Sequence, residues 1–169
     1  VLTQSPALQA QGIDFFKGSW EEALEAAKKQ EKIIFVDAYT TWCGPCKRMA
    51  KNIFPLPEVG AVYNDFCINI KLNMETPEGL EFQKKYPVSA YPTFYFIDEK
   101  GEAIMNVKGG RSKDDFIALG GHSLAAIRVT ARLNEALETD FPLNKIFERP
   151  TIAEYAVYIE ETLTELLNA

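Results

Sequence analysis

The chain has 169 residues, 47% hydrophobic and 25% charged, which is a globular composition and argues against disorder. Its 18 Lys and Arg are outnumbered by 24 Asp and Glu, giving a formal net charge of -6. An acidic chain is a poor candidate for non-specific nucleic-acid binding, which depends on neutralising phosphates. Three cysteines exclude a dense disulfide scaffold, and a zinc site would need all of them plus the single His122, so we expect no metal. No apolar stretch is long enough to span a bilayer.

Residues 1–11 carry no helix or strand pattern, lack an initiator Met and include small residues near Ala10. Two interpretations are equally open: the remnant of a secretory signal peptide cleaved near Ala10, or a disordered terminus. A signal remnant would indicate an extracytoplasmic compartment.

Residues 12–119 alternate between helix and strand patterns. Ser19 and Glu22 form a capping box ahead of apolar residues at helical spacing. Short apolar runs predict three strands, the last pairing in a hairpin with a fourth across a turn that ends in Gly101; the four segments are 33–36, 67–72, 93–97 and 104–107. Helices are expected around 57–64 and 79–86. The sequence therefore predicts a mixed α/β fold in which helices flank a central sheet.

After Gly120 the strand patterns vanish and only helical patterns remain, at 123–137, at 144–147 and from a second capping box at Thr151 onward. This shift predicts a domain boundary near Leu119–Gly120, with a small all-α segment over residues 120–169.

The sequence Trp42-Cys43-Gly44-Pro45-Cys46 follows the first predicted strand and precedes a helical pattern. A cysteine at a helix N-terminus is favoured as a thiolate, the nucleophile of thiol–disulfide exchange, and the second cysteine then lies one turn along on the same face. We expect Cys43 to be the more exposed and more acidic thiol. Half of a zinc site or a static disulfide are the alternatives, and a missing second cysteine pair disfavours zinc.

Residues 12–119 resemble the thioredoxin superfamily, especially its extracytoplasmic thiol–disulfide interchange members, through the Trp42–Cys46 motif and several further positions. The resemblance implies a thioredoxin-like fold with Cys43 and Cys46 as the catalytic pair. Asp37 matches the buried acid that moves protons near Cys46, and Lys71 matches its usual neighbour.

The same resemblance assigns a substrate-binding groove. Tyr91-Pro92-Thr93 matches a cis-proline loop facing the cysteines, and Gly109 matches a glycine of the same groove. Its remaining predicted members are Trp42, Gly44 and Pro45. Protein dithiols or disulfides are the implied substrates, a thioredoxin-reducing protein is an implied partner, and the redox site needs no cofactor. Cys67, within an apolar strand, is expected to be inert core.

A different motif follows at Asp114–Leu124, where Gly120-Gly121-His122-Ser123 precedes a helical pattern. From the residues alone, Ser123 is either a helix cap or a hydroxyl at a phosphate-binding helix start, and a serine hydrolase fits poorly. The segment from Asp114 to the C-terminus resembles peptidyl carrier domains of nonribosomal peptide synthetases. That resemblance implies a 4′-phosphopantetheine arm on Ser123, a phosphopantetheinyl transferase and synthetase domains as partners, and a cytoplasmic location for this part.

The two resemblances compete for residues 114–119, which are a terminal helix in one family and a loop in the other. The carrier-like part also lacks the first helix of its bundle, so we interpret the chain as a chimera. Because Phe116 suits the apolar face of a helix on the sheet, we expect a helix from Ser112 to Leu119, a break at Gly120-Gly121, and a new helix beginning with an exposed Ser123.

Three hypotheses follow: a thioredoxin-like oxidoreductase with a helical appendage, a carrier module with a thioredoxin-like fusion partner, and a hybrid in which neither site is competent. The first is favoured, because the thioredoxin-like part retains every element of its site.

Overall fold

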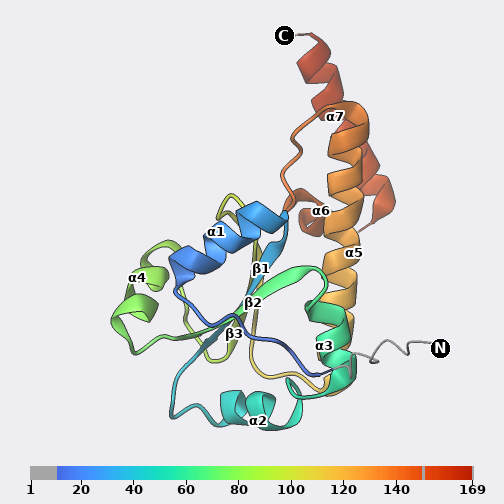
Figure 1. Ribbon diagram of the computed structural model, residues 1–169. Coiled ribbons are helices and arrows are strands. Elements are labelled where there is room, and N and C mark those ends of the chain that lie inside the picture. The colour runs from blue at the N-terminus through green and yellow to red at the C-terminus, as the bar shows by residue number, and fades with distance from the viewer. Residues whose placement is uncertain (1–10, 150, 169) are drawn as a thin grey trace, which may run out of the picture. The chain divides into compact units, whose positions relative to one another are not determined.

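The computed structural model describes residues 11–149 and 151–168 (Figure 1). The expectation of a signal remnant or disordered terminus lies almost entirely outside the described residues. The chain divides into two compact units, residues 1–121 and 122–169.

A four-stranded mixed sheet forms the centre of the first unit, in the order β2-β1-β3-β4. Its strands are β1 (Ile33–Tyr39), β2 (Cys67–Asn73), β3 (Thr93–Ile97) and β4 (Ala103–Lys108). β1 runs parallel to β2 and antiparallel to β3, and β3 and β4 form the expected hairpin. The predicted strands are confirmed, each as long as expected or slightly longer. The two central strands are almost wholly buried, which explains why their sequences are continuous apolar runs rather than alternating ones.

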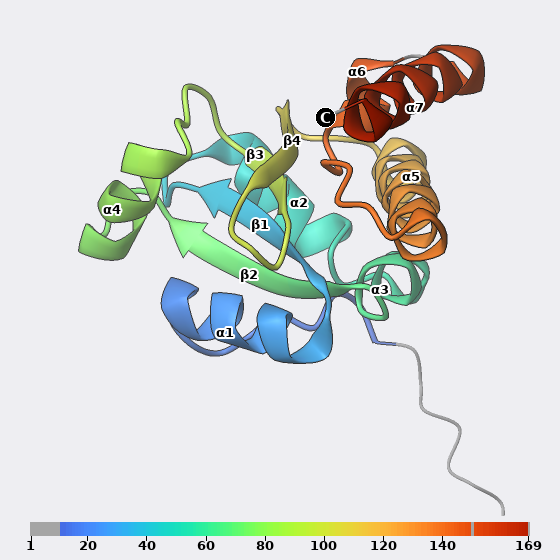
Figure 2. The same ribbon diagram turned by 90° about the horizontal axis from the view of Figure 1, so that it is seen from above.

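Helices cover both faces of this sheet (Figure 2). Helices α1 (Trp20–Gln30) and α4 (Pro77–Lys85) pack on the face that carries Ile34, Val36 and Ala38. Helices α2 (Gly44–Asn52) and α3 (Pro57–Tyr63) lie in the chain between β1 and β2, and Tyr63 of α3 meets Phe35 on the opposite face. The capping box at Ser19 forms as predicted: the Ser19 side chain accepts from Glu22 N, and the Glu22 side chain accepts from Ser19 N.

An aromatic cluster fills the α3 side of the sheet and includes the start of α5 (Lys113–Leu137). The Phe116 ring stacks on Tyr63 with centroids 4.7 Å apart and meets the edge of Phe94 at 5.2 Å. The Tyr63 hydroxyl donates to the Phe116 carbonyl at 3.0 Å. Phe116 has no exposed surface, so residues of α5 complete the core of the thioredoxin-like unit, as the apolar spacing predicted. Rings paired in this way stabilise a core beyond the burial of their area.

The predicted break at Gly120-Gly121 is wrong, because α5 continues through both glycines. Gly120 is buried against α3, where a Cβ atom would come within 2.7 Å of the Tyr63 ring. Its missing side chain thus permits close packing of two helices instead of ending one. A glycine inside a helix costs about 1 kcal/mol relative to alanine, so two glycines weaken the helix without necessarily ending it.

The second unit contains the C-terminal part of α5, a short α6 (Lys145–Glu148) and α7 (Ile152–Leu167). The buried hydroxyls of Thr130 and Tyr155 lie 2.9 Å apart and join α5 to α7. The Asn134 side chain accepts from Phe141 N at 2.7 Å and donates to Phe141 O at 3.0 Å, which secures the loop after α5. The capping box at Thr151 forms as predicted. Within the described residues, none of the helices has the length and apolarity to cross a membrane.

The two adjacent glycines provide a matched test of the continuous helix. We expect Gly120→Ala to lower the free energy of unfolding by about 1–3 kcal/mol, because the new methyl group must displace the Tyr63 ring. Gly121→Ala should raise it by up to about 1 kcal/mol, because the space beside Gly121 is open and alanine is the better helix former. Urea denaturation measures both values. Equal effects of the two substitutions would contradict the packing described for α5.

Candidate redox site

Cys43 and Cys46 form a disulfide at the N-terminus of α2, with their Cα atoms 5.3 Å apart. Cys43 is the N-cap residue, and its Sγ accepts a hydrogen bond from Cys46 N at 3.1 Å. After reduction, this N–H group and the helix dipole would stabilise a thiolate on Cys43. In this disulfide form both cysteines are buried, with Cys43 3% and Cys46 4% exposed, and the greater exposure of Cys43 as a free thiol stays a prediction. The bond draws the two sulfur atoms together, so each shields the other.

The buried acid lies on the strand that leads to the disulfide. Asp37 is paired in register with Lys71 across β1 and β2, and Lys71 Nζ lies 3.3 Å from Asp37 Oδ2. Burial raises the pKa of Asp37 to about 6, while the Lys71 charge opposes that rise. Three rings surround the ammonium group at 4.9–5.3 Å from their centroids: Phe15, Tyr39 and Phe54. These rings replace part of the water that Lys71 loses beside Asp37.

Glu75 positions the tryptophan of the motif and was missed in the sequence analysis. Its carboxylate accepts from Trp42 Nε1 at 3.1 Å, from Thr41 N at 3.0 Å and from Thr41 Oγ1 at 2.9 Å. The Thr41 hydrogen bonds are the main reason why the pKa of Glu75 is lowered. Trp42 is thereby held in place although 65% of it is exposed. Nothing in the local sequence signals this, since Glu75 lies 33 residues beyond Trp42.

Pairwise contacts link several of the predicted groove residues to one another or to a neighbouring residue. The Tyr91–Pro92 bond is cis, as expected from the resemblance. The Tyr91 ring meets the Trp42 ring edge to face at 5.7 Å. On the other side, Gly109 N donates to Pro92 O at 2.7 Å, and the φ of Gly109, 86°, lies in the region that favours glycine. Next to it, Gly110 lies beside Pro45. No side chain or backbone atom approaches the open side of Gly44 within the described residues.

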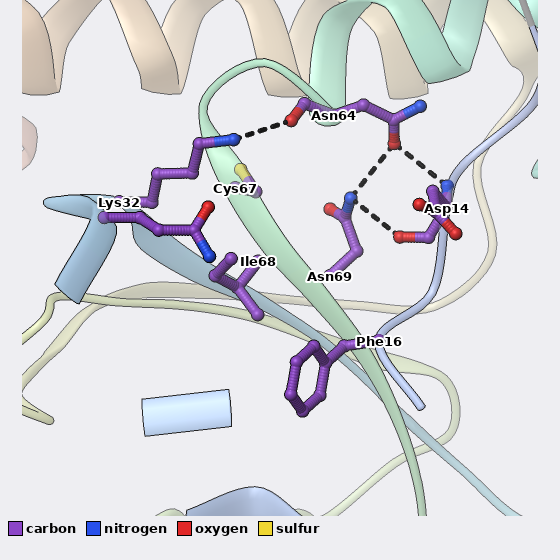
Figure 3. A pocket seen from close by; sticks show the side chains of 8 residues that line it. Asp14, Phe16, Lys32, Asn64, Cys67, Ile68 and Asn69 are labelled. Atoms are coloured by element: carbon purple, nitrogen blue, oxygen red, sulfur yellow. Dashed lines mark hydrogen bonds between the residues drawn. The ribbon is translucent and has the colours of Figure 1, made fainter. Parts of the chain in front are cut away.

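Cys67 lies at the opposite end of the sheet from the disulfide, because it pairs with Ile33 at the start of β1 whereas Cys43 follows the end of β1. Burial raises the pKa of this thiol to about 12, so it stays protonated. It lines a pocket of about 240 Å³ where Asn69 Nδ2 donates to Asp14 O and Asn64 Oδ1 (Figure 3). These contacts attach the segment before α1 to the edge strand β2.

Ser123 does not occupy a helix start and is not exposed, so both expectations for it are wrong. It lies inside α5, ten positions after Lys113, and is 2% exposed. The helix does not break at the glycines, so no new N-terminus forms at Ser123. No group of three or more His, Cys, Asp or Glu side chains is placed to hold a metal ion in the part of the chain that the structure describes.

Residues 20–123 match the thioredoxin-like domain family, and residues 103–159 match the phosphopantetheine attachment site family. The first match spans more than half of the chain. The chain belongs to the thioredoxin-like family. Its structure is similar to the solution structure of a Bacteroides thetaiotaomicron protein described as a disulphide-isomerase, with 43% identity and a TM-score of 0.58 over 66% of this chain and 95% of that one.

Sequence relatives of this thioredoxin-like chain are of two kinds. It is 35% identical over 86 residues, half of its length, to the thiol:disulfide interchange protein DsbD of Pseudoalteromonas atlantica, and spans 14% of that protein. It is 49% identical over 61 residues, 36% of its length, to tyrocidine synthase 3 of Brevibacillus parabrevis, and spans 1% of that enzyme. The chain thus joins a thioredoxin-like domain to a carrier-like segment, and it covers a small part of each of these relatives.

The raised pKa of Asp37 predicts that stability depends on pH. The folded state holds the proton on Asp37 more tightly than the unfolded state does, so the contribution of Asp37 to stability is greatest below about pH 4 and is lost as the pH rises through about 6, by on the order of 2–3 kcal/mol. We expect Asp37→Asn to abolish this fall, measured by urea denaturation between pH 4 and 7. The same substitution at the exposed Asp65 is the control. An unchanged slope in Asp37→Asn would show that another group causes the dependence.

Glu75→Ala should release the Trp42 side chain, because three hydrogen bonds to the carboxylate disappear. We expect higher mobility of Trp42, measured as lower fluorescence anisotropy with Trp20→Phe as the background. The control is Glu78→Ala, whose carboxylate accepts from Trp20 N, a backbone group that the Trp20→Phe background keeps. Equal anisotropy in Glu75→Ala and its parent would show that the carboxylate does not position Trp42.

Proposed function

We propose that the protein is a thiol–disulfide oxidoreductase that exchanges electrons with protein disulfides through Cys43 and Cys46. The supporting observation is the disulfide at the N-terminus of α2, where Cys46 N donates to Cys43 Sγ. A helix N-terminus that directs an N–H group at one sulfur favours its thiolate and makes that sulfur the nucleophile.

The reduced protein would act in two exchange steps. Cys43 thiolate attacks one sulfur of a substrate disulfide, so a mixed disulfide forms and the other substrate sulfur leaves as a thiolate. The Cys46 thiol then loses its proton and attacks Cys43 Sγ, which forms the Cys43–Cys46 bond and releases the second substrate thiolate. Two electrons pass to the substrate, and the protein ends in the disulfide form that the structure shows.

Asp37 is the proposed proton acceptor for Cys46. A pKa of about 6 means that the carboxylate is mainly ionised at neutral pH yet accepts a proton more readily than an ordinary aspartate. Lys71 and its surrounding rings act as positioning residues, because the ammonium charge keeps the pKa of Asp37 from rising further. The reaction needs no separate cofactor, since the sulfur pair itself carries the electrons.

The groove beside the disulfide is proposed to hold an extended segment of the substrate. Tyr91 precedes the cis bond and would offer its backbone to such a segment as an added strand. Trp42, Gly44, Pro45, Pro92 and Gly109 would form the walls of this groove. The exposed Trp42 ring supplies apolar contact area next to the reacting sulfur.

Protein dithiols and disulfides are the proposed substrates, and a thioredoxin-reducing protein is the proposed electron source. The similarity to a thiol:disulfide interchange protein supports an extracytoplasmic site of action for the thioredoxin-like part.

A carrier function is the second candidate, supported by the match of residues 103–159 and the likeness to tyrocidine synthase 3. In that function Ser123 would carry phosphopantetheine, and a phosphopantetheinyl transferase and synthetase domains would be the partners. This part of the chain would then act in the cytoplasm. The redox function is favoured because the thioredoxin-like match spans the larger part of the chain and Cys43 and Cys46 form a disulfide.

Cysteine variants test the redox function. In reduction of insulin by dithiothreitol, Cys43→Ser should lose the catalysed rate, because it lacks the nucleophile. Cys46→Ser should accumulate a mixed disulfide through Cys43, since nothing resolves it, and intact-mass spectrometry detects that adduct. Cys67→Ala is the matched control and should keep the rate, because Cys67 is buried at the far end of the sheet. Loss of the rate in Cys67→Ala alone would contradict the assignment.

A further inference from the structure

Residues 103–123 belong to both family matches, yet one chain can give them only one conformation. We infer that Ser123 cannot accept phosphopantetheine in this chain, because the attachment motif lies inside a continuous helix that begins in the thioredoxin-like unit. The disagreement between motif and structure rests on three observations about α5.

The first observation is the position of Ser123 in α5. In the transfer reaction, the serine Oγ forms a bond to the phosphorus of coenzyme A that bears the pantetheine, the pyrophosphate bond breaks, and adenosine 3′,5′-bisphosphate leaves. The hydroxyl must therefore reach a bulky donor. Ser123 is 2% exposed and lies ten positions beyond the start of its helix. The free backbone N–H groups that attract phosphate at a helix N-terminus are near Lys113, three turns away.

The second observation is the pattern of burial along the helix. In the part of α5 that belongs to the second unit, Ser123, Ile127 and Thr130 recur at intervals of four and three and are buried on one face of the helix, together with Leu124. His122 and Ala125, on either side of Ser123, are exposed. Ser123 therefore lies on the buried face of this part of α5.

The third observation concerns the packing of the residues before Ser123 against the thioredoxin-like core. For the Ser123 hydroxyl to lie at an exposed helix start, α5 would have to break at Gly120-Gly121. Gly120 is packed against Tyr63, and Phe116 is fully buried in the aromatic cluster and accepts the Tyr63 hydrogen bond. A break would disturb these contacts. The packing of Phe116 and Gly120 therefore opposes a break of α5 ahead of Ser123.

Thiol alkylation measures the accessibility of this position directly. The parent is Cys67→Ala with the Cys43–Cys46 disulfide intact, so that an introduced cysteine is the only free thiol. Into this parent we would place Ser123→Cys, which is nearly isosteric, and the matched controls His122→Cys and Ala125→Cys at exposed positions. We expect iodoacetamide to label the Ser123→Cys variant at least about tenfold more slowly than either control, because reaction requires local opening of α5.

A second measurement uses the unsubstituted chain. Incubation with a phosphopantetheinyl transferase and coenzyme A, followed by intact-mass spectrometry, should leave the mass unchanged, while a complete carrier domain in the same mixture is modified. Labelling of the Ser123→Cys variant within about twofold of the controls would overturn the inference. So would stoichiometric modification at Ser123 in a chain that still reduces insulin.

Discussion

The packing of Phe116 on Tyr63 attaches the beginning of α5 to the thioredoxin-like core. It joins the beginning of α5 to α3 and, through Phe35 and Phe94, to the centre of the sheet. A buried ring in such a cluster contributes on the order of 3–5 kcal/mol, a large share of the stability of a small domain. In the carrier-like alternative, residues 114–119 would form a loop beside a bundle that lacks its first helix. The thioredoxin-like core therefore determines the conformation of the shared residues, and Gly120 allows the two helices to approach.

The redox site depends on the same scaffold. β1 carries Asp37 into the interior and ends shortly before Cys43, so one strand places both the proposed proton acceptor and the proposed nucleophile. Lys71 reaches Asp37 because β1 and β2 are paired in register. The Lys71 charge lies among three rings rather than in open water, which keeps it close to Asp37. The proposed proton transfer and thiolate formation thus depend on backbone elements whose positions are fixed by packing.

Much of the fold and the site could be predicted from local sequence signals. The buried strands, both capping boxes and the strand–turn–helix context of Cys43 are encoded in short segments, and each formed. The cis bond at Pro92 was expected from the resemblance to thioredoxins. Tyr39 could also have been found, because it lies two residues after Asp37 on the same face of the strand. Glu75 could not, since its partner Trp42 is far away in the sequence.

The predicted helix break at Gly120-Gly121 and the predicted exposed helix start at Ser123 were wrong, because local sequence preferences there differ from the observed structure. Two glycines commonly end a helix and a serine commonly caps one, but tertiary contacts override both preferences here. Amide hydrogen exchange along α5, measured on the intact chain, tests this account most directly. Protection at Gly120 through Ser123 equal to that at Phe116 is the expected result for one helix held by the core. Rapid exchange at these four amides, with protected amides on both sides, would contradict it.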